Sequence, residues 1–231
     1  MIGYDKLSLN FNLLYHLTLE ETLAAMPTVG DRAKPHHTTT PNGGTIAYGA
    51  LPSGFPYFDL TRATPDYLDC PAAATNDLDF TTGDFSGAIW VYRDLDLQAD
   101  LICKSNGVTG YVFGLNVAAG EIRITTYQAG PTSQASLSAA GIVPATTWTL
   151  LGFSRDGAVC RVFVNGRDVT DTAGTHINPA SAAALDLNIG VANDKASNAF
   201  DGRLTQPRLW GRALSVLEHL QLFNMERHWF L

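Results

Sequence analysis

The sequence is poor in charge: charged residues make up only 16% of its 231 residues, and the lysines and arginines form neither a run nor a basic helix. The formal net charge is -7 at pH 7. Because proteins that bind nucleic acids normally present a positively charged surface, we expect no nucleic-acid partner. Low charge combined with 45% hydrophobic residues predicts a sizeable core, and the length fits one large domain over residues 1–231.

A long uninterrupted apolar segment is also missing from the N-terminus. Polar and charged residues recur every few positions across residues 1–21. Such a segment can neither cross a bilayer nor supply the apolar core of a signal peptide. We therefore expect no membrane partner and no standard export route.

Cysteine is scarce, with Cys70, Cys103 and Cys160 as the three cases. None of them belongs to a Cys-x-x-Cys motif or lies next to a histidine, which argues against a zinc site or a redox pair. The number is odd, and two of the three lie in apolar, strand-like segments. We predict buried free thiols and synthesis in a reducing compartment.

The strongest structural signal that is present lies in the segment 147–169. Trp148–Ser154 and Val159–Val164 both show the alternation of a strand. Asn165-Gly166 then matches a two-residue hairpin turn, whose central positions need positive φ. Three consecutive antiparallel strands are predicted here, which favours a β-sandwich.

Further strands are predicted where short apolar stretches are bounded by turn residues. These predicted strands cover residues 7–17, 57–60, 66–69, 85–93, 100–104, 110–117, 121–127, 135–137, 185–191 and 200–210. Pro207 cannot donate a ladder hydrogen bond, so the last strand should be an edge or bulged strand. Ser215 and Glu218 have the spacing of a capping box, which predicts a short helix over residues 216–224.

The order of these motifs resembles the laminin-G-like, concanavalin A-like jelly-roll family of lectin and glucanase folds, in its pentraxin-related bacterial and phage branch. The resemblance runs from about residue 10 to 224 and is carried by Asp31–His37, Asp66–Asp69, Phe85–Val91, Trp148–Phe153, Val164–Gly166 and Gly202–Ser215. It implies an all-β fold, a two-sheet antiparallel jelly-roll sandwich (concanavalin A-like) with a short C-terminal helix.

The same resemblance bears on metal binding. Family members often carry an acid in the closing strand that helps to hold a structural Ca²⁺, whereas this sequence has Thr205 at that position. Calcium needs six to eight oxygen ligands, several of them anionic. Asp31 and Asp201 are the residues left for a weak calcium site, and no other cofactor is expected. His36 and His37 point to opposite sides of an extended chain, which favours a structural role over metal binding.

A glucanase activity is not supported by the glutamates. Glucanases of this fold use two glutamates on one strand, in an E-x-D-x-x-E arrangement, because acid and nucleophile must lie close together on one face. The chain has five glutamates, and none is arranged in this way. No catalytic residue is predicted, and a glycoside hydrolase is the least favoured function.

Aromatic residues on neighbouring strands are candidates for glycan binding. The candidates are Trp90, Tyr92, Tyr111, Arg123 and Tyr127. A pyranose ring stacks its apolar face on an aromatic ring while its hydroxyls form directed hydrogen bonds. The alternative is that these rings fill the core between two sheets, which is also the interpretation for Trp148 and Trp210.

The C-terminal residues 225–231 form an apolar tail after a domain core of about residues 7–224. Chain ends are normally polar, so this tail should either fold back over the sandwich or dock on a neighbouring subunit. Trp229, Phe230 and Leu231 are the assembly candidates.

The leading functional hypothesis is a non-enzymatic virion surface protein, made in the host cytoplasm, as a phage capsid decoration or a tail or fibre component. Its partners would be other virion proteins or further copies of itself, with the jelly-roll face open to glycans. The alternative is a stand-alone carbohydrate-binding, lectin-like module that reaches the extracellular space by a non-standard route. Both rest on family analogy and not on a recognised site.

Overall fold

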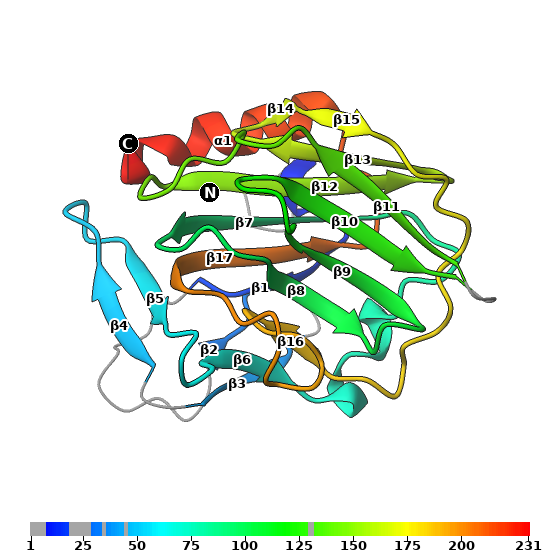
Figure 1. Ribbon diagram of the computed structural model, residues 1–231, viewed down its shortest axis with the longest axis horizontal. Coiled ribbons are helices and arrows are strands. Elements are labelled where there is room, and N and C mark those ends of the chain that lie inside the picture. The colour runs from blue at the N-terminus through cyan, green and yellow to red at the C-terminus, as the bar shows by residue number, and fades with distance from the viewer. Residues whose placement is uncertain (1–7, 19–28, 34–35, 44–45, 129–131) are drawn as a thin grey trace.

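The computed structural model describes residues 8–18, 29–33, 36–43, 46–128 and 132–231, and its strands form two antiparallel sheets packed face to face (Figure 1). The eight-stranded sheet runs in the order β14 (Arg167–Asp168), β13 (Val159–Val164), β12 (Thr149–Asp156), β7 (Phe85–Arg93), β17 (Gly202–Trp210), β5 (Pro56–Leu60) and β4 (Ala47–Ala50), with β1 (Leu13–His16) also paired to β17. The nine-stranded sheet runs in the order β15 (Thr170–Thr172), β11 (Ser133–Ser138), β10 (Ile122–Tyr127), β9 (Gly110–Leu115), β8 (Ala99–Ser105), β16 (Leu187–Ile189), β6 (Tyr67–Cys70), β3 (Thr38–Asn42) and β2 (Val29–Gly30). The predicted jelly-roll sandwich is confirmed. Short 3₁₀ turns cover Ser8–Asn10, Ala72–Ala74 and Asn76–Leu78.

The predicted hairpin at the centre of the sequence is confirmed. β12 pairs with β13 and β13 with β14, all antiparallel. Asn165 and Gly166 join β13 to β14 with φ of 50° and 76°, the left-handed values that this turn needs. A Cβ on Gly166 would lie 2.6 Å from Leu220 Cα, so the turn also packs directly against the helix.

The last strand is bulged, which is one of the two forms expected for it. β17 lies between β7 and β5 and is therefore central, not an edge strand. The predicted bulge is present: the pairing with β7 shifts register between Thr205 and Arg208, and Gln206 has φ of 54°. On its other side, β17 pairs with β5 before the bulge and with β1 after it. Pro207 is tolerated because it lies within the bulge.

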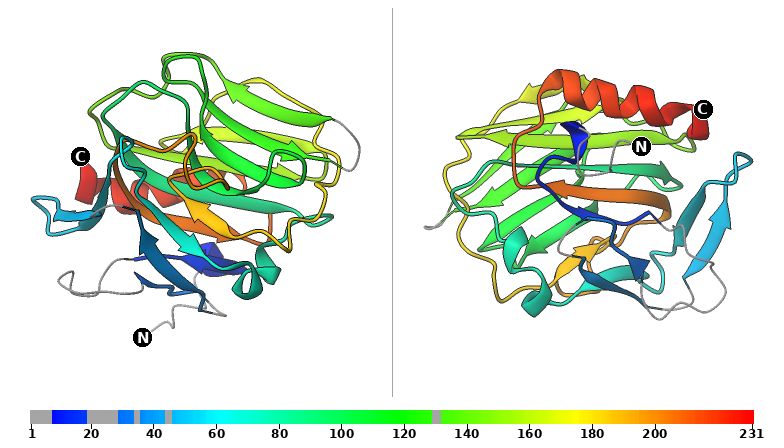
Figure 2. Two further views of the ribbon diagram at one scale, coloured as in Figure 1. Left: turned by 60° about the horizontal axis from the view of Figure 1, so that its bottom comes forward. Right: turned by 180° about the vertical axis from the view of Figure 1, so that it is seen from behind.

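Strand alternation divides the apolar side chains between two cores. On β7, Phe85, Ile89 and Val91 face the nine-stranded sheet and form the main core. Trp90, on the opposite face of β7, joins a second cluster between the eight-stranded sheet and the helix α1 (Val216–Phe230). α1 thus covers part of the outer face of this sheet (Figure 2).

The helix begins where the sequence predicts and ends later. The capping box is present, because Ser215 Oγ accepts from the Glu218 N–H and the Glu218 carboxylate accepts from the Ser215 N–H. The helix has 15 residues and includes most of the tail that was expected to be a separate segment. Phe230 stacks on Trp90 with ring centroids 4.0 Å apart. The tail folds back over the sandwich through Phe230, whereas Trp229 and Leu231 are 38% and 69% exposed.

No helix in the described ranges is long and apolar enough to cross a membrane.

The three cysteines are free and buried, as predicted. Burial raises the pKa of each thiol to about 12. Because the thiolate is the reactive form, we expect none of the three to react with iodoacetamide at pH 8 in the folded protein and all three to react in denaturant. Mass spectrometry of the intact chain would count the adducts, and fast labelling of the folded protein would contradict this burial.

Candidate functional site

The outer face of the nine-stranded sheet, which points away from the main core, carries a cross-strand row of polar residues. Asp69 on β6 pairs with Asn188 on β16, and Asn188 pairs with Cys103 on β8. On β10, Ile122 and Ile124 point into the core, so alternation places Arg123 and Tyr127 on the outer face. Polar residues of β6, β16 and β10 therefore share the outer face, with β8 and β9 between β16 and β10.

Several hydrogen-bonding atoms on this surface are buried without a partner among the described residues. They are Asp69 Oδ1, Arg123 Nε and both amide atoms of Asn188. Asn188 is completely buried, which makes its unpaired amide energetically costly. Buried polar groups in native proteins are nearly always hydrogen-bonded, so unpaired groups on one face indicate a place for a polar ligand or ordered water.

An ion pair sets the charge of this surface. Arg123 Nη2 donates to Asp100 Oδ1 at 2.7 Å, and Asn198 Nδ2 donates to Asp100 Oδ2 at 3.3 Å. Burial raises the pKa of the Asp100 carboxyl, and the Arg123 charge opposes this shift only in part. Both charged groups are mostly buried, so the pair offers directed hydrogen bonds with little net charge.

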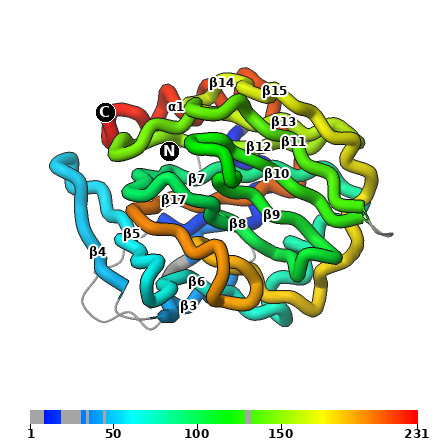
Figure 3. Tube along the Cα trace, viewed as in Figure 1, coloured from blue at the N-terminus to red at the C-terminus, as the bar shows by residue number. Residues whose placement is uncertain are grey.

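Residues 190–201, the connection between β16 and β17, lie against β8 and the edge of this polar surface (Figures 1 and 3). Lys195 Nζ donates to Asp69 at 3.1 Å and to Asp186 at 2.9 Å. Lys195 and Asn198 have φ of 59° and 48°, which is rare for residues with a side chain. The connection is held in an uncommon backbone conformation by contacts to the same polar surface.

The five predicted glycan-binding residues separate into three places. Arg123 and Tyr127 lie together on the outer face of the nine-stranded sheet, with Tyr127 half-buried. Tyr92 is half-buried on the outer face of the eight-stranded sheet. The five candidates therefore do not share one surface.

Two of those residues are core residues, in line with the alternative interpretation. Tyr111 lies in the main core 5.0 Å from Phe85, and its hydroxyl donates to Leu78 O. Trp90 is fully buried beneath Phe230. Alternation assigns a side chain to a face but does not reveal whether another element covers that face.

Sequence reasoning missed Asp69, Asp100 and Asn188. A signal existed for two of them, because Leu68-Asp69-Cys70 and Leu187-Asn188-Ile189 each place one polar residue between two apolar ones. In a strand, this pattern turns the polar side chain alone to the outer face.

The two residues expected to hold calcium do not share a site. The Asp31 carboxylate accepts from the backbone N–H groups of His16, Ala33 and His37. Asp201 accepts from the Arg62 N–H and, among the described residues, has no hydrogen-bond partner in common with Asp31. In the part of the chain that is described, no three His, Cys, Asp or Glu side chains are grouped so that they could hold a metal ion. The geometry therefore does not fit a calcium site built on this pair.

Asp31 also anchors a buried histidine. His37 Nδ1 lies 2.6 Å from Asp31 Oδ2, and His37 Nε2 lies 2.9 Å from Asp77 Oδ1. Burial alone would lower the pKa of the imidazole, but hydrogen bonds and charges from both carboxylates outweigh it and raise the pKa to about 9. His37 is therefore a cation that joins the segment before β3 to the 3₁₀ turn Asn76–Leu78.

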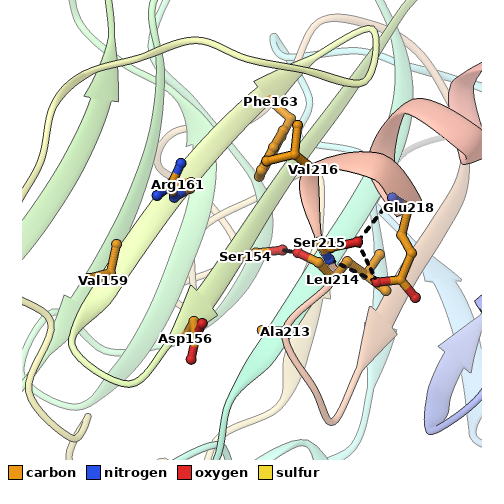
Figure 4. A pocket seen from close by; sticks show the side chains of 10 residues that line it. All are labelled: Ser154, Asp156, Val159, Arg161, Phe163, Ala213, Leu214, Ser215, Val216 and Glu218. Carbon is orange, nitrogen blue, oxygen red and sulfur yellow. Dashed lines mark hydrogen bonds between the residues drawn. The ribbon is translucent and has the colours of Figure 1, made fainter.

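An open groove of about 510 Å³ lies between the β12–β13 hairpin and the first turn of α1 (Figure 4). Its polar side chains are largely engaged within the protein. Ser215 and Glu218 form the capping box, and Arg161 pairs with Asp168 at 2.8 Å. The groove offers fewer unpaired groups to a ligand than the outer face of the nine-stranded sheet.

A serine and a histidine meet below this groove. Ser154 Oγ donates to Leu214 O and lies 2.8 Å from His219 Nε2. Burial lowers the pKa of His219 to about 3. Such a weakly basic imidazole cannot activate a hydroxyl near neutral pH, so the pair serves to fix α1 on the sheet.

A known protein family matches this chain. The model of the concanavalin A-like lectin/glucanases superfamily matches residues 67–218, more than half of the chain. No curated protein matches the chain.

Solved structures share the fold at low sequence identity. The binding domain of Paraclostridial mosquitocidal protein 1 is 15% identical, with a TM-score of 0.70 over 94% of this chain and 53% of that chain. The receptor-binding domain of botulinum neurotoxin C/D mosaic serotype is 9% identical, with a TM-score of 0.68 over 94% of this chain and 52% of that one. The binding domain of botulinum neurotoxin DC, solved in complex with SialylT, is 12% identical, with a TM-score of 0.67 and the same coverage.

This chain spans about half the length of each of these three structures. The likeness therefore concerns one part of each of those longer chains. Taken together, the two-sheet sandwich and the family match show that the chain belongs to the concanavalin A-like lectin/glucanase superfamily.

Proposed function

We propose that this protein is a non-catalytic, lectin-like domain that binds glycans on the outer face of its nine-stranded sheet. The observation that carries the proposal is the polar face around Asp69 and Arg123, whose side chains stay partly exposed and each have an atom with no partner in the described ranges. Glycan hydroxyls both donate and accept hydrogen bonds, so they can bind a carboxylate and a guanidinium together. The half-buried Tyr127 ring on the same face is available to an apolar sugar face.

The partners of similar structures agree with this proposal. Botulinum neurotoxin type C is described as interacting with two ganglioside molecules, and the neurotoxin DC binding domain was solved with SialylT and with synaptotagmin II. This chain covers about half of each of these structures. The polar surface of this chain remains the main argument.

A binding role is favoured over hydrolysis because the described glutamates are not arranged as a catalytic pair. Of the glutamates in the described ranges, Glu121 precedes β10, while Glu218 and Glu226 belong to α1. A retaining glycosidase needs two carboxyl groups about 5–5.5 Å apart on one face. Glu121 lies apart from α1, and none of these three glutamates lies on a strand of the nine-stranded sheet.

The proposal predicts that Arg123→Ala weakens glycan binding at least tenfold, because a charged hydrogen bond contributes about 1.5–3 kcal/mol. A glycan array would identify the ligand of the unmodified protein, and isothermal titration calorimetry would compare the variants. Tyr127→Ala should weaken binding of the same ligand.

Arg161→Ala is the matched control, because Arg161 is an exposed, ion-paired arginine on the other sheet. It should bind as the unmodified protein does. Equal binding by Arg123→Ala and the control, with both variants folded, would show that the ligand lies elsewhere.

We also propose, from the family resemblance alone, that the domain acts at a virion surface. Its apolar tail gives this idea no independent support, since Phe230 packs within the same chain. Recovery of the protein in fixed stoichiometry with purified particles would support a virion role. Its absence from such particles would leave the lectin-like module as the whole function.

A further inference from the structure

We propose that the outer face of the eight-stranded sheet carries a second binding site, built on Tyr57, Tyr92 and Arg203, whose ligand is a neutral pyranoside. This site lies on the opposite sheet from the polar surface described above and shares no residue with it. It does not depend on glycan binding at Arg123.

Arg203 is the centre of the second site. It lies on β17, paired with Asp59 of β5 on one side and with Tyr92 of β7 on the other. Its guanidinium carbon lies 4.9 Å from the Tyr92 ring centroid and 5.4 Å from that of Tyr57. Nε donates to Asp59 at 3.3 Å, and in the described ranges the two terminal nitrogens have no hydrogen-bond partner. The Arg203 guanidinium is thus held in place by Asp59 and the two tyrosine rings, while its two terminal nitrogens are available to donate to a ligand.

Both tyrosine rings are supported from below. Each lies 5.8 Å from the buried Trp148 ring. Tyr57 further depends on Gly49 of the neighbouring β4, because a Cβ there would lie 2.3 Å from Tyr57 Cζ. The rings are half-buried, so each keeps part of its surface in contact with solvent. The site is therefore formed before a ligand arrives, which reduces the entropic cost of binding.

The chemistry of the site matches a neutral sugar. Arg203 supplies donors, Asp59 and the exposed Asp94 supply acceptors, and the tyrosines supply apolar ring surface. These are the groups that adjacent sugar hydroxyls and a pyranose face require.

An anionic sugar fits less well because acids outnumber bases around Arg203. Burial raises the pKa of Asp94, and the nearby Asp59 and Asp201 charges add to this shift while Arg203 opposes it. Asp59 and Asp94 thus both lie near the Arg203 guanidinium, and a further negative charge would be repelled.

Two sites on opposite sheets could be occupied at the same time. Figure 1 shows the two sheets as separate layers, and Figure 2 shows the far side that carries β17 and β5. A domain of this kind would link two glycan chains, and its avidity for a dense glycan surface would exceed the affinity of either site.

The test is two-dimensional NMR of the isotope-labelled full chain, titrated with methyl pyranosides of glucose, galactose, mannose and N-acetylglucosamine, and with methyl glucuronide as the anionic probe. Concentrations up to about 20 mM cover the weak affinities of single sugar rings, whose Kd is near 1 mM. We expect saturable shifts at Tyr57, Tyr92 and Arg203 with at least one neutral pyranoside.

Arg203→Ala and Tyr92→Ala should weaken those shifts at least tenfold, whereas Arg161→Ala should leave them unchanged. Gly49→Ala provides a further variant that removes no binding group and displaces only the Tyr57 ring. Arg123→Ala separates the two proposals, since it should abolish binding at the first site and spare the second.

The proposal is overturned if no neutral pyranoside shifts these resonances, if Arg203→Ala binds as tightly as the control, or if methyl glucuronide binds here more tightly than its neutral counterparts. Thermal unfolding of each variant confirms that the compared proteins are folded.

Discussion

Replacing Glu226 with alanine is expected to lower the free energy of unfolding by about 3–5 kcal/mol, the usual cost of leaving a buried charge without its partner. Glu226 lies within α1, buried against the eight-stranded sheet. Its carboxylate accepts from Trp90 Nε1 at 2.8 Å and from Arg208 Nη2. Arg208 Nη1 already has no partner in the described ranges, and Nη2 donates to the neutral Gln206 Oε1 as well as to Glu226, so loss of Glu226 leaves the buried positive charge without its carboxylate.

Chemical denaturation measures this effect, with Gln221→Ala as the control at an exposed position of the same helix. The control should change stability by less than about 0.5 kcal/mol. The double variant Arg208→Met with Glu226→Leu should recover most of the loss, because it removes both charges and keeps apolar volume. A cost below about 1 kcal/mol for Glu226→Ala would mean that water reaches this ion pair.

The second large effect depends on pH and on His37. Because the pKa of His37 is raised from about 6.5 in the unfolded chain to about 9 in the folded one, protonation stabilises the folded state. This stabilisation of the folded state by His37 is fully present below pH 6.5 and is lost as the pH rises through 9. A shift of this size corresponds to about 3 kcal/mol.

The measurement compares the unmodified protein with His37→Gln, whose neutral side chain cannot titrate. The difference in unfolding free energy should be about 3 kcal/mol larger at pH 6 than at pH 10. His228→Gln, at an exposed position on α1, serves as the control for replacing a histidine with glutamine. A difference that stays constant with pH would show that the imidazole is neutral between its two carboxylates.

Local patterns predicted most of the strands because the determinants of a strand are local. The Asn165-Gly166 turn and the alternation of Val159–Val164 specify a hairpin without reference to distant residues. The central position of β17 could not be predicted in this way. It depends on pairing with β7 and β5, which are far away in the sequence.

The length of α1 was underestimated for a physical reason. Leu222, Glu226 and Phe230 recur every four residues and form its buried face. A charged residue in the middle of that face hides the helical pattern, because its burial is explained only by Arg208 and Trp90 on the sheet. The same helix explains why Trp90 was misplaced as a glycan-binding residue.

The candidate site was predicted only in part. Arg123 and Tyr127 were found because aromatic and basic residues on one strand face are conspicuous. Asn188 was missed, since a single polar residue in a short apolar strand looks like an ordinary surface position. Its burial depends on residues 190–201 and on the pairing with Asp69, neither of which a local pattern contains.

The pairing of β1 with β17 has a consequence for how the molecule folds. Leu13 lies opposite Trp210, so this contact closes a loop that contains nearly the whole chain. Such distant pairings raise the contact order and slow the search for the native state. β17 must first be placed against β7 and β5 before it can present an edge to β1. Pairing of β1, the first described strand, is thus the natural last step of assembly. Until β1 is in place, the edge of β17 that it covers stays open to other strands.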